Sequence, residues 1–143
     1  MNDFHRLAQF ITCCWRLGEA GSDRIPTSHG ILDSAIQQVL AETTVPSWVE
    51  NGLTFVDSRI GLQCIELPSI LEWAQRAQLT SAPNPSYETT EVQVSQRLAA
   101  KLVASLGVDE DTAKEVGNRL KKYTDESRAA LVSSNHALIE DYL

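Results

Sequence analysis

The sequence predicts a mainly α-helical protein: a multi-helix domain with one small β-hairpin around residues 53–66 and a long helical segment at the C-terminal end. Apolar residues recur every three or four positions over most of the chain, which is the period of an amphipathic helix. Only 5 prolines and 7 glycines occur among 143 residues, so few positions interrupt helices. Hydrophobic residues make up 43% and charged residues 22%, close to the averages of globular domains, which indicates a chain able to form its own core.

The first predicted element is a helix over residues 3–17. Asp3 can cap its beginning, and Gly18 is placed to end it. The spacing of its apolar residues predicts that one face is buried. This face comprises Phe4, Leu7, Phe10, Ile11, Cys14 and Trp15. Residues 19–26 contain turn formers and are expected to form a loop.

A second helix is predicted over residues 29–42, after a cap at Thr27 or Ser28. Its apolar face comprises Ile31, Leu32, Ala35, Ile36, Val39 and Leu40. A short helix over residues 46–51 follows. Gly52 is expected to end this short helix in the left-handed conformation that glycine adopts readily.

Alternating apolar and polar residues then replace the helical period and predict a β-hairpin. Its strands are expected near residues 53–57 and 61–66, joined by a turn over residues 57–61. An isolated hairpin is marginally stable in water, so it must lie against helices. A helix over residues 68–79 follows, with Pro68 in its first turn. Its inward residues are expected to be Ile70, Leu71, Trp73, Ala74 and Ala77.

Residues 80–90 are polar and rich in proline, and are predicted to be a linker or a surface loop. They separate a helical domain with the hairpin (residues 1–79) from a C-terminal helical pair (residues 91–143). We interpret this pair as the oligomerisation part of one domain. Its first helix is expected over residues 91–106 and to end at Gly107. The apolar face of this helix comprises Val94, Leu98, Leu102, Val103 and Leu106.

The segment from Asp109 to the C-terminal residue is expected to be helical throughout. Its apolar stripe comprises Val116, Leu120, Tyr123, Ser127, Leu131, Leu138 and Tyr142. A helix of roughly 33 residues is about 50 Å long, whereas a compact chain of this size has a diameter of roughly 38 Å. Either a new helix begins at residues 124–125, or the helix projects and its last three stripe residues pack on a second copy. We expect self-association, as a homodimer or a larger homo-oligomer.

The charge balance is acidic. The chain carries 12 basic and 19 acidic residues, for a net charge of −7. Nucleic-acid binding is disfavoured, because its affinity depends on positive side chains that displace counterions from phosphates. Every basic residue before Lys101 is an arginine. Composition drift explains this pattern; the alternative is that some arginines pair with carboxylates in partly buried places.

Catalytic patterns are missing from the sequence. It contains no glycine-rich phosphate loop, no nucleophile elbow and no His-Glu-x-x-His pair. We therefore predict no catalytic residue, no cofactor and no metal, and we favour a protein that is not an enzyme over a small enzyme or redox protein that uses one of its cysteines. Cys13, Cys14 and Cys64 are interpreted as small buried hydrophobes, with a redox or metal-binding thiol as the alternative. His136 and Glu140 could share a helix face, but two ligands do not make a metal site.

Five charged or aromatic positions outside the C-terminal stripe are candidate contact residues. Trp48, in the short helix, is a candidate for a protein interface, since aromatic residues dominate interface hot spots. Lys114, Lys121 and Arg128 recur every seven residues on one helix face and could meet phosphate or an acidic partner, although a solvated face is the simpler interpretation. Arg59 at the hairpin turn is a further candidate for such a contact.

These observations favour a non-catalytic regulatory protein that acts through protein–protein contacts. The alternative is a DNA-binding transcriptional regulator, because the order of helix, helix, short helix and hairpin resembles a winged-helix layout with the C-terminal helices as dimer arms. The short helix would then read the DNA groove, yet residues 46–51 contain no basic side chain. The chain shows no signal-peptide pattern and no apolar run of membrane length, so a cytoplasmic location away from membranes is expected.

Overall fold

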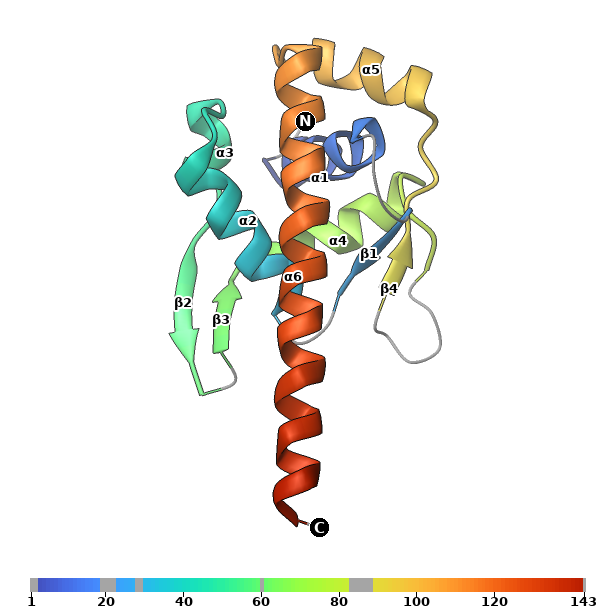
Figure 1. Cartoon of the computed structure of the whole chain (residues 1–143). Helices are drawn as coiled ribbons and strands as arrows, with labels where there is room; N and C mark the ends of the chain where they lie inside the picture. Colours follow the sequence, from blue (N-terminus) through green and yellow to red (C-terminus); the bar gives the residue numbers. More distant parts are fainter. Residues whose placement is uncertain (1–2, 19–22, 28–29, 60, 83–88, 143) are drawn as a thin grey trace.

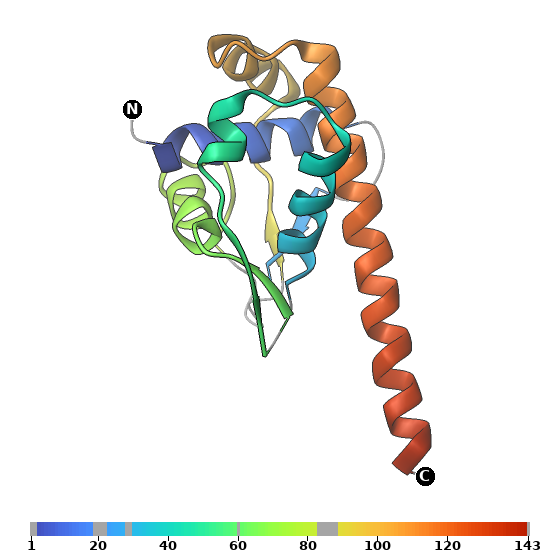
Figure 2. The same cartoon turned by 90° about the vertical axis from the view of Figure 1, so that its left-hand side faces the viewer.

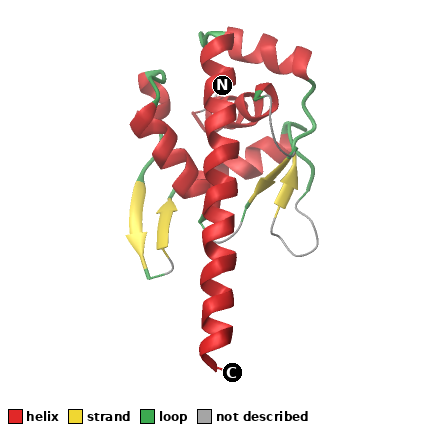
Figure 3. Ribbon diagram, viewed as in Figure 1, coloured by secondary structure: helices red, strands yellow, loops and turns green. Residues whose placement is uncertain are grey.

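A computed structural model describes the backbone of residues 3–18, 23–27, 30–59, 61–82 and 89–142, and within these ranges the side chains up to residue 129. The protein is mainly α-helical with minor β-structure, as predicted (Figure 3). In chain order the elements are α1 (Asp3–Leu17), β1 (Arg24–Pro26), α2 (Ile31–Glu42), α3 (Ser47–Asn51), β2 (Phe55–Ser58), β3 (Gly61–Cys64), α4 (Leu67–Arg76), β4 (Thr89–Glu91), α5 (Gln96–Ser105) and α6 (Glu110–Tyr142).

Helix α1 lies at the centre of the molecule and packs against α4, α5 and α6 (Figure 1). Its bounds match the prediction, but the prediction of a single buried face is wrong. Gln9, Thr12 and Cys13 are buried as well, so the helix is enclosed on nearly all sides between Leu7 and Leu17. The buried Thr12 hydroxyl donates a hydrogen bond to the backbone oxygen of Ala8 at 2.7 Å, which satisfies it without a partner from another element.

Helix α6 is continuous over 33 residues, with no new helix beginning at residues 124–125. Its first half packs across α1 and α2. The buried residues of this half are Ala113, Val116, Gly117, Leu120, Lys121, Tyr123 and Thr124. The second half extends well past the rest of the molecule, as both side views show (Figures 1 and 2).

In the described part of the chain, four short strands form two separate antiparallel pairs. The predicted hairpin is present as β2 and β3, with Phe55 opposite Cys64. The second pair, β1 with β4, was not predicted: Arg24 lies opposite Glu91, where a loop and the end of a linker were expected. Strands of three residues are too short to show alternation, and these two come from distant parts of the sequence.

Two predicted helix ends differ from the structure. Helix α2 begins after Gly30, whose φ of 67° is left-handed, whereas a cap at Thr27 or Ser28 was expected; residue 28 lies outside the described part of the chain. Gly52 has a φ of −85° and ends α3 in a right-handed conformation, contrary to the prediction. Gly107 does end α5 as expected, with a φ of 76°.

The predicted apolar face of α5 is wrong at Leu98 but right at Val94 and Val103, which are buried. The helix begins later than expected, after Ser95, whose hydroxyl accepts a hydrogen bond from the backbone N–H of Leu98 at 3.1 Å. Ala99 and Val103 are buried, whereas 46% of Leu98 is exposed. Residues four apart turn about 40° further round a helix at each step, so a long series at this spacing does not stay on one face.

One hydrophobic core joins both parts of the chain. It includes Ile25 and Ile70 from the part before residues 80–90, and Val92 and Leu120 from the part after it. The pairing of β1 with β4 links the same two parts through backbone hydrogen bonds.

Candidate functional site

Among the residues whose positions are described, no group of three or more His, Cys, Asp or Glu side chains could hold a metal ion. The side chains of His136 and Glu140 lie outside the described part of the chain. None of the helices described is long and apolar enough to cross a bilayer.

The three cysteines are free and buried. Burial raises the pKa of Cys13 to about 11 and that of Cys64 to about 11, and it raises the pKa of Cys14 well above the ordinary value. The thiolate is the reactive form of cysteine, so these thiols are protonated and unreactive at neutral pH. The geometry favours the interpretation of all three as small buried hydrophobes.

Arg16 shows the partly buried arginine–carboxylate pairing that the absence of early lysines suggested. Its Nη1 donates to Asp23 Oδ1 at 2.7 Å, while Nε and Nη2 donate to the backbone oxygens of Val94 and Val92 at 2.7 and 2.6 Å. The side chain is 18% exposed. This fork joins the end of α1 to the segments beside β1 and β4, which is a structural role.

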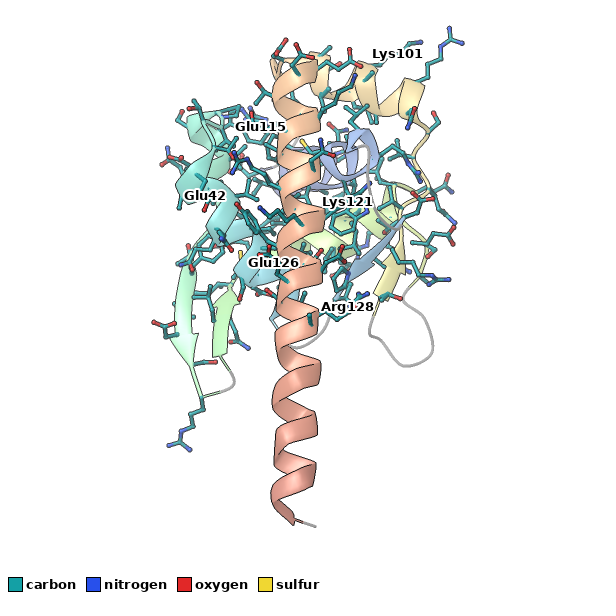
Figure 4. All side chains as sticks on the ribbon, viewed as in Figure 1. Glu42, Lys101, Glu115, Lys121, Glu126 and Arg128 are labelled. Carbon is teal, nitrogen blue, oxygen red and sulfur yellow. The ribbon has the colours of Figure 1, made fainter. Side chains whose placement is uncertain are left out.

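A second polar cluster, labelled in part in Figure 4, joins α6 to α2. Arg119 donates to Glu42 Oε2 at 2.9 Å and to Glu115 Oε1 at 3.2 Å. The hydroxyl of Tyr123 also donates to Glu42 Oε2. This hydrogen bond lowers the pKa of Glu42 and raises that of Tyr123, because it favours the ionised carboxylate and the protonated phenol.

The predicted basic face of α6 is divided by the packing. Lys121 is only 6% exposed, and its Nζ donates to the backbone oxygen of Gly18 at 2.9 Å. Desolvation lowers the pKa of this ammonium group. Lys121 is therefore a buried contact between α1 and α6, and the prediction that it faces phosphate or an acidic partner is not supported.

The other predicted cations are accessible but dispersed. Lys114 lies 3.9 Å from Glu110 one turn earlier on α6. Arg128 is exposed where α6 leaves the rest of the molecule (Figure 4). Arg59 is exposed beside the hairpin turn, on another element. The three do not form one basic surface.

Trp48 is half-buried against α1. Its ring meets that of Phe10 edge-on, with the ring centres 5.9 Å apart, and the Arg6 guanidinium lies 4.2 Å from its centre. Residues of the same chain therefore already cover part of the surface of the Trp48 ring. The other predicted interface residues belong to α6, and their side chains lie outside the described part of the chain. These residues are Leu131, Leu138 and Tyr142.

A cleft of about 900 Å³ lies between the beginning of α2, strand β3 and helix α4. Asp33 of α2 is fixed at its wall, because its Oδ2 accepts a hydrogen bond from the backbone N–H of Cys64 at 2.7 Å. Glu72 of α4 also lines it. The sequence showed these carboxylates only as scattered residues, since no spacing pattern relates three elements that come together through the fold.

In the cleft, the Cys64 thiol donates a hydrogen bond to Glu66 Oε1 at 3.8 Å, but burial raises the pKa of this thiol to about 11 and keeps it protonated at neutral pH. Comparison of the chain with protein families, curated protein sequences and solved structures found no match.

Proposed function

We propose that this protein is a non-catalytic regulatory protein that acts through protein–protein contacts and self-associates through the second half of α6. The observation that carries the proposal is the division of this helix. The half that ends near Thr124 packs on α1 and α2, while the half after it extends away from the rest of the molecule (Figure 2). At 1.5 Å per residue this projecting half is about 27 Å long.

The sequence of the projecting half supports an apolar contact. Residues 130–132 read Ala-Leu-Val, and residues 137–139 repeat this pattern as Ala-Leu-Ile, seven positions later. Positions seven apart in a continuous helix lie on the same face, two turns from each other. A second copy presents the same stripe, so a symmetric pair of α6 helices would cover both stripes at once.

The site geometry supports a role that is not catalytic. The clustered polar groups, such as Arg16 and Arg119 with their partners, join elements of the fold. The thiols of Cys13 and Cys64 are buried, and neither forms a disulfide bond. Free cysteines are typical of reducing compartments, which supports a proposed cytoplasmic location.

The winged-helix alternative receives less support. The element order from α1 to β3 is the expected one, but β1 pairs with β4 instead of joining the hairpin. The short helix α3 carries no basic residue, and its Trp48 is engaged by Arg6 and Phe10. Such a helix offers no positive charge to a DNA groove.

Sedimentation velocity of two matched variants tests the proposal. Leu138→Asp places a charge on the apolar stripe, whereas Ser133→Asp places the same charge on the opposite face of the same helix. We expect the first variant to sediment as a monomer and the second to sediment like the native chain. Equal sedimentation of all three proteins would contradict a contact through this stripe.

A further inference from the structure

We infer that the cleft between α2, β3 and α4 binds a small organic cation that carries an apolar portion. This inference is independent of self-association, because none of the cleft-lining residues that the structure describes belongs to α6. Its volume of about 900 Å³ lies within the range of ligand pockets, roughly 300–1,000 Å³.

The charges around the cleft select a cation. Asp33 and Glu72 are in its lining, and no lysine, arginine or histidine is among the described residues that line it. Glu72 is already ion-paired, because Arg76 Nη2 lies 2.6 Å from its Oε1. The carboxylate of Asp33 therefore remains to favour a positive ligand and to repel a negative one. The net charge of −7 acts in the same direction.

The beginning of α2 also lies at the cleft, and a helix N-terminus by itself attracts anions. Gly30 marks this end, and Asp33 occupies the first turn of the helix. The carboxylate of Asp33 therefore already offsets the partial positive charge of the helix end. Its hydrogen bond to the Cys64 N–H uses Oδ2 and holds the carboxylate in place at the wall.

The remaining walls select an apolar portion beside the charge. Leu62, Leu67, Pro68 and Leu71 line the cleft, and they come from β3 and α4. Burying a short alkyl chain against them contributes roughly 0.8 kcal/mol per methylene group in water-to-apolar transfer. A primary alkylamine has both features, an ammonium group for Asp33 and a chain for these side chains.

Calorimetric titration of the full chain with n-hexylammonium tests the inference, with hexanoate and 1-hexanol as probes of equal chain length. We expect saturable binding of n-hexylammonium, weaker binding of the alcohol and no binding of hexanoate. Binding of hexanoate as strong as that of n-hexylammonium, or no saturable binding of the amine, would overturn the inference.

Two variants locate the binding. Asp33→Asn keeps an oxygen that can accept the Cys64 N–H but removes the charge, and we expect it to weaken binding of n-hexylammonium about tenfold or more. Asp57→Asn removes an exposed carboxylate of β2 outside the cleft and should leave the affinity unchanged. Leu71→Trp fills the cleft from a half-buried position and should abolish binding. Native affinity in either Asp33→Asn or Leu71→Trp would show that the amine binds elsewhere and overturn the assignment.

Discussion

Gly117 of α6 and Cys14 of α1 are in backbone contact. A methyl group on Gly117 would overlap the carbonyl oxygen of Cys14 and would lie 2.8 Å from its carbonyl carbon. A methyl group on Gly18 would likewise lie 2.8 Å from the carbonyl carbon of Gly117. The central helix and the long helix can cross this closely only because both positions are glycine.

Gly117→Ala should therefore destabilise the protein, although alanine is the better helix former by about 1 kcal/mol. Overpacking against backbone atoms, which cannot move aside as a flexible side chain can, is expected to lower the free energy of unfolding by about 3 kcal/mol. Urea denaturation measures this change. Asp125→Ala, at an exposed position of the same helix, should leave stability nearly unchanged. A Gly117→Ala protein as stable as the native chain would show that the two helices do not cross at this point.

Arg16→Lys should also be destabilising, although it keeps the charge. A lysine ammonium cannot reproduce the planar fork that donates to Val92, Val94 and Asp23 together. Leaving one buried backbone oxygen without its donor costs about 1–3 kcal/mol of unfolding free energy. The exposed Arg97→Lys is the matched control, and equal denaturation midpoints for both variants would argue against this role of Arg16.

Lys121→Met tests whether the buried ammonium group holds α6 to the end of α1. Methionine fills a similar volume but leaves the backbone oxygen of Gly18 without its donor. We expect a loss of about 1–2 kcal/mol in the free energy of unfolding, because this loss is partly offset by the removal of a desolvated charge. Lys122→Met, at an exposed position, should have little effect in the same thermal or urea measurement.

The raised pKa of Cys13 predicts a loss of stability in alkali. The unfolded thiol ionises near 9.0 and the folded thiol near about 11, so the folded state binds more protons between these values. Its contribution to stability is present below 9.0 and is lost as the pH rises toward about 11. Cys13→Ala removes this group, so the difference in unfolding free energy between the native chain and the variant should shrink over this interval. A constant difference across the same pH range would mean that burial does not raise the pKa of this thiol.

The sequence could predict those parts of the fold that depend on local patterns. A cap at Asp3 and a stop at Gly18 predicted the bounds of α1, and the turn over residues 57–61 indicated the hairpin. The proline-free segment after Asp109 indicated helix throughout but left open a break at residues 124–125, and α6 is continuous. Each of these features depends on neighbours in the chain.

Features that depend on distant contacts could not be predicted in this way. The pairing of Arg24 with Glu91 needs two segments of three residues whose patterns are too short to recognise. Lys121 shares the spacing of Lys114 and Arg128, and only the position of Gly18 in the fold explains why it is buried. The cleft beside Asp33 likewise arises where three elements meet.

Light scattering of the native chain over a range of micromolar concentrations tests the central claim most directly. If the projecting half of α6 pairs with that of a second copy, the measured mass should be at least twice the 15.8 kDa of one chain at the higher concentrations and should fall on dilution. A constant mass of 15.8 kDa at every concentration would contradict self-association through this helix.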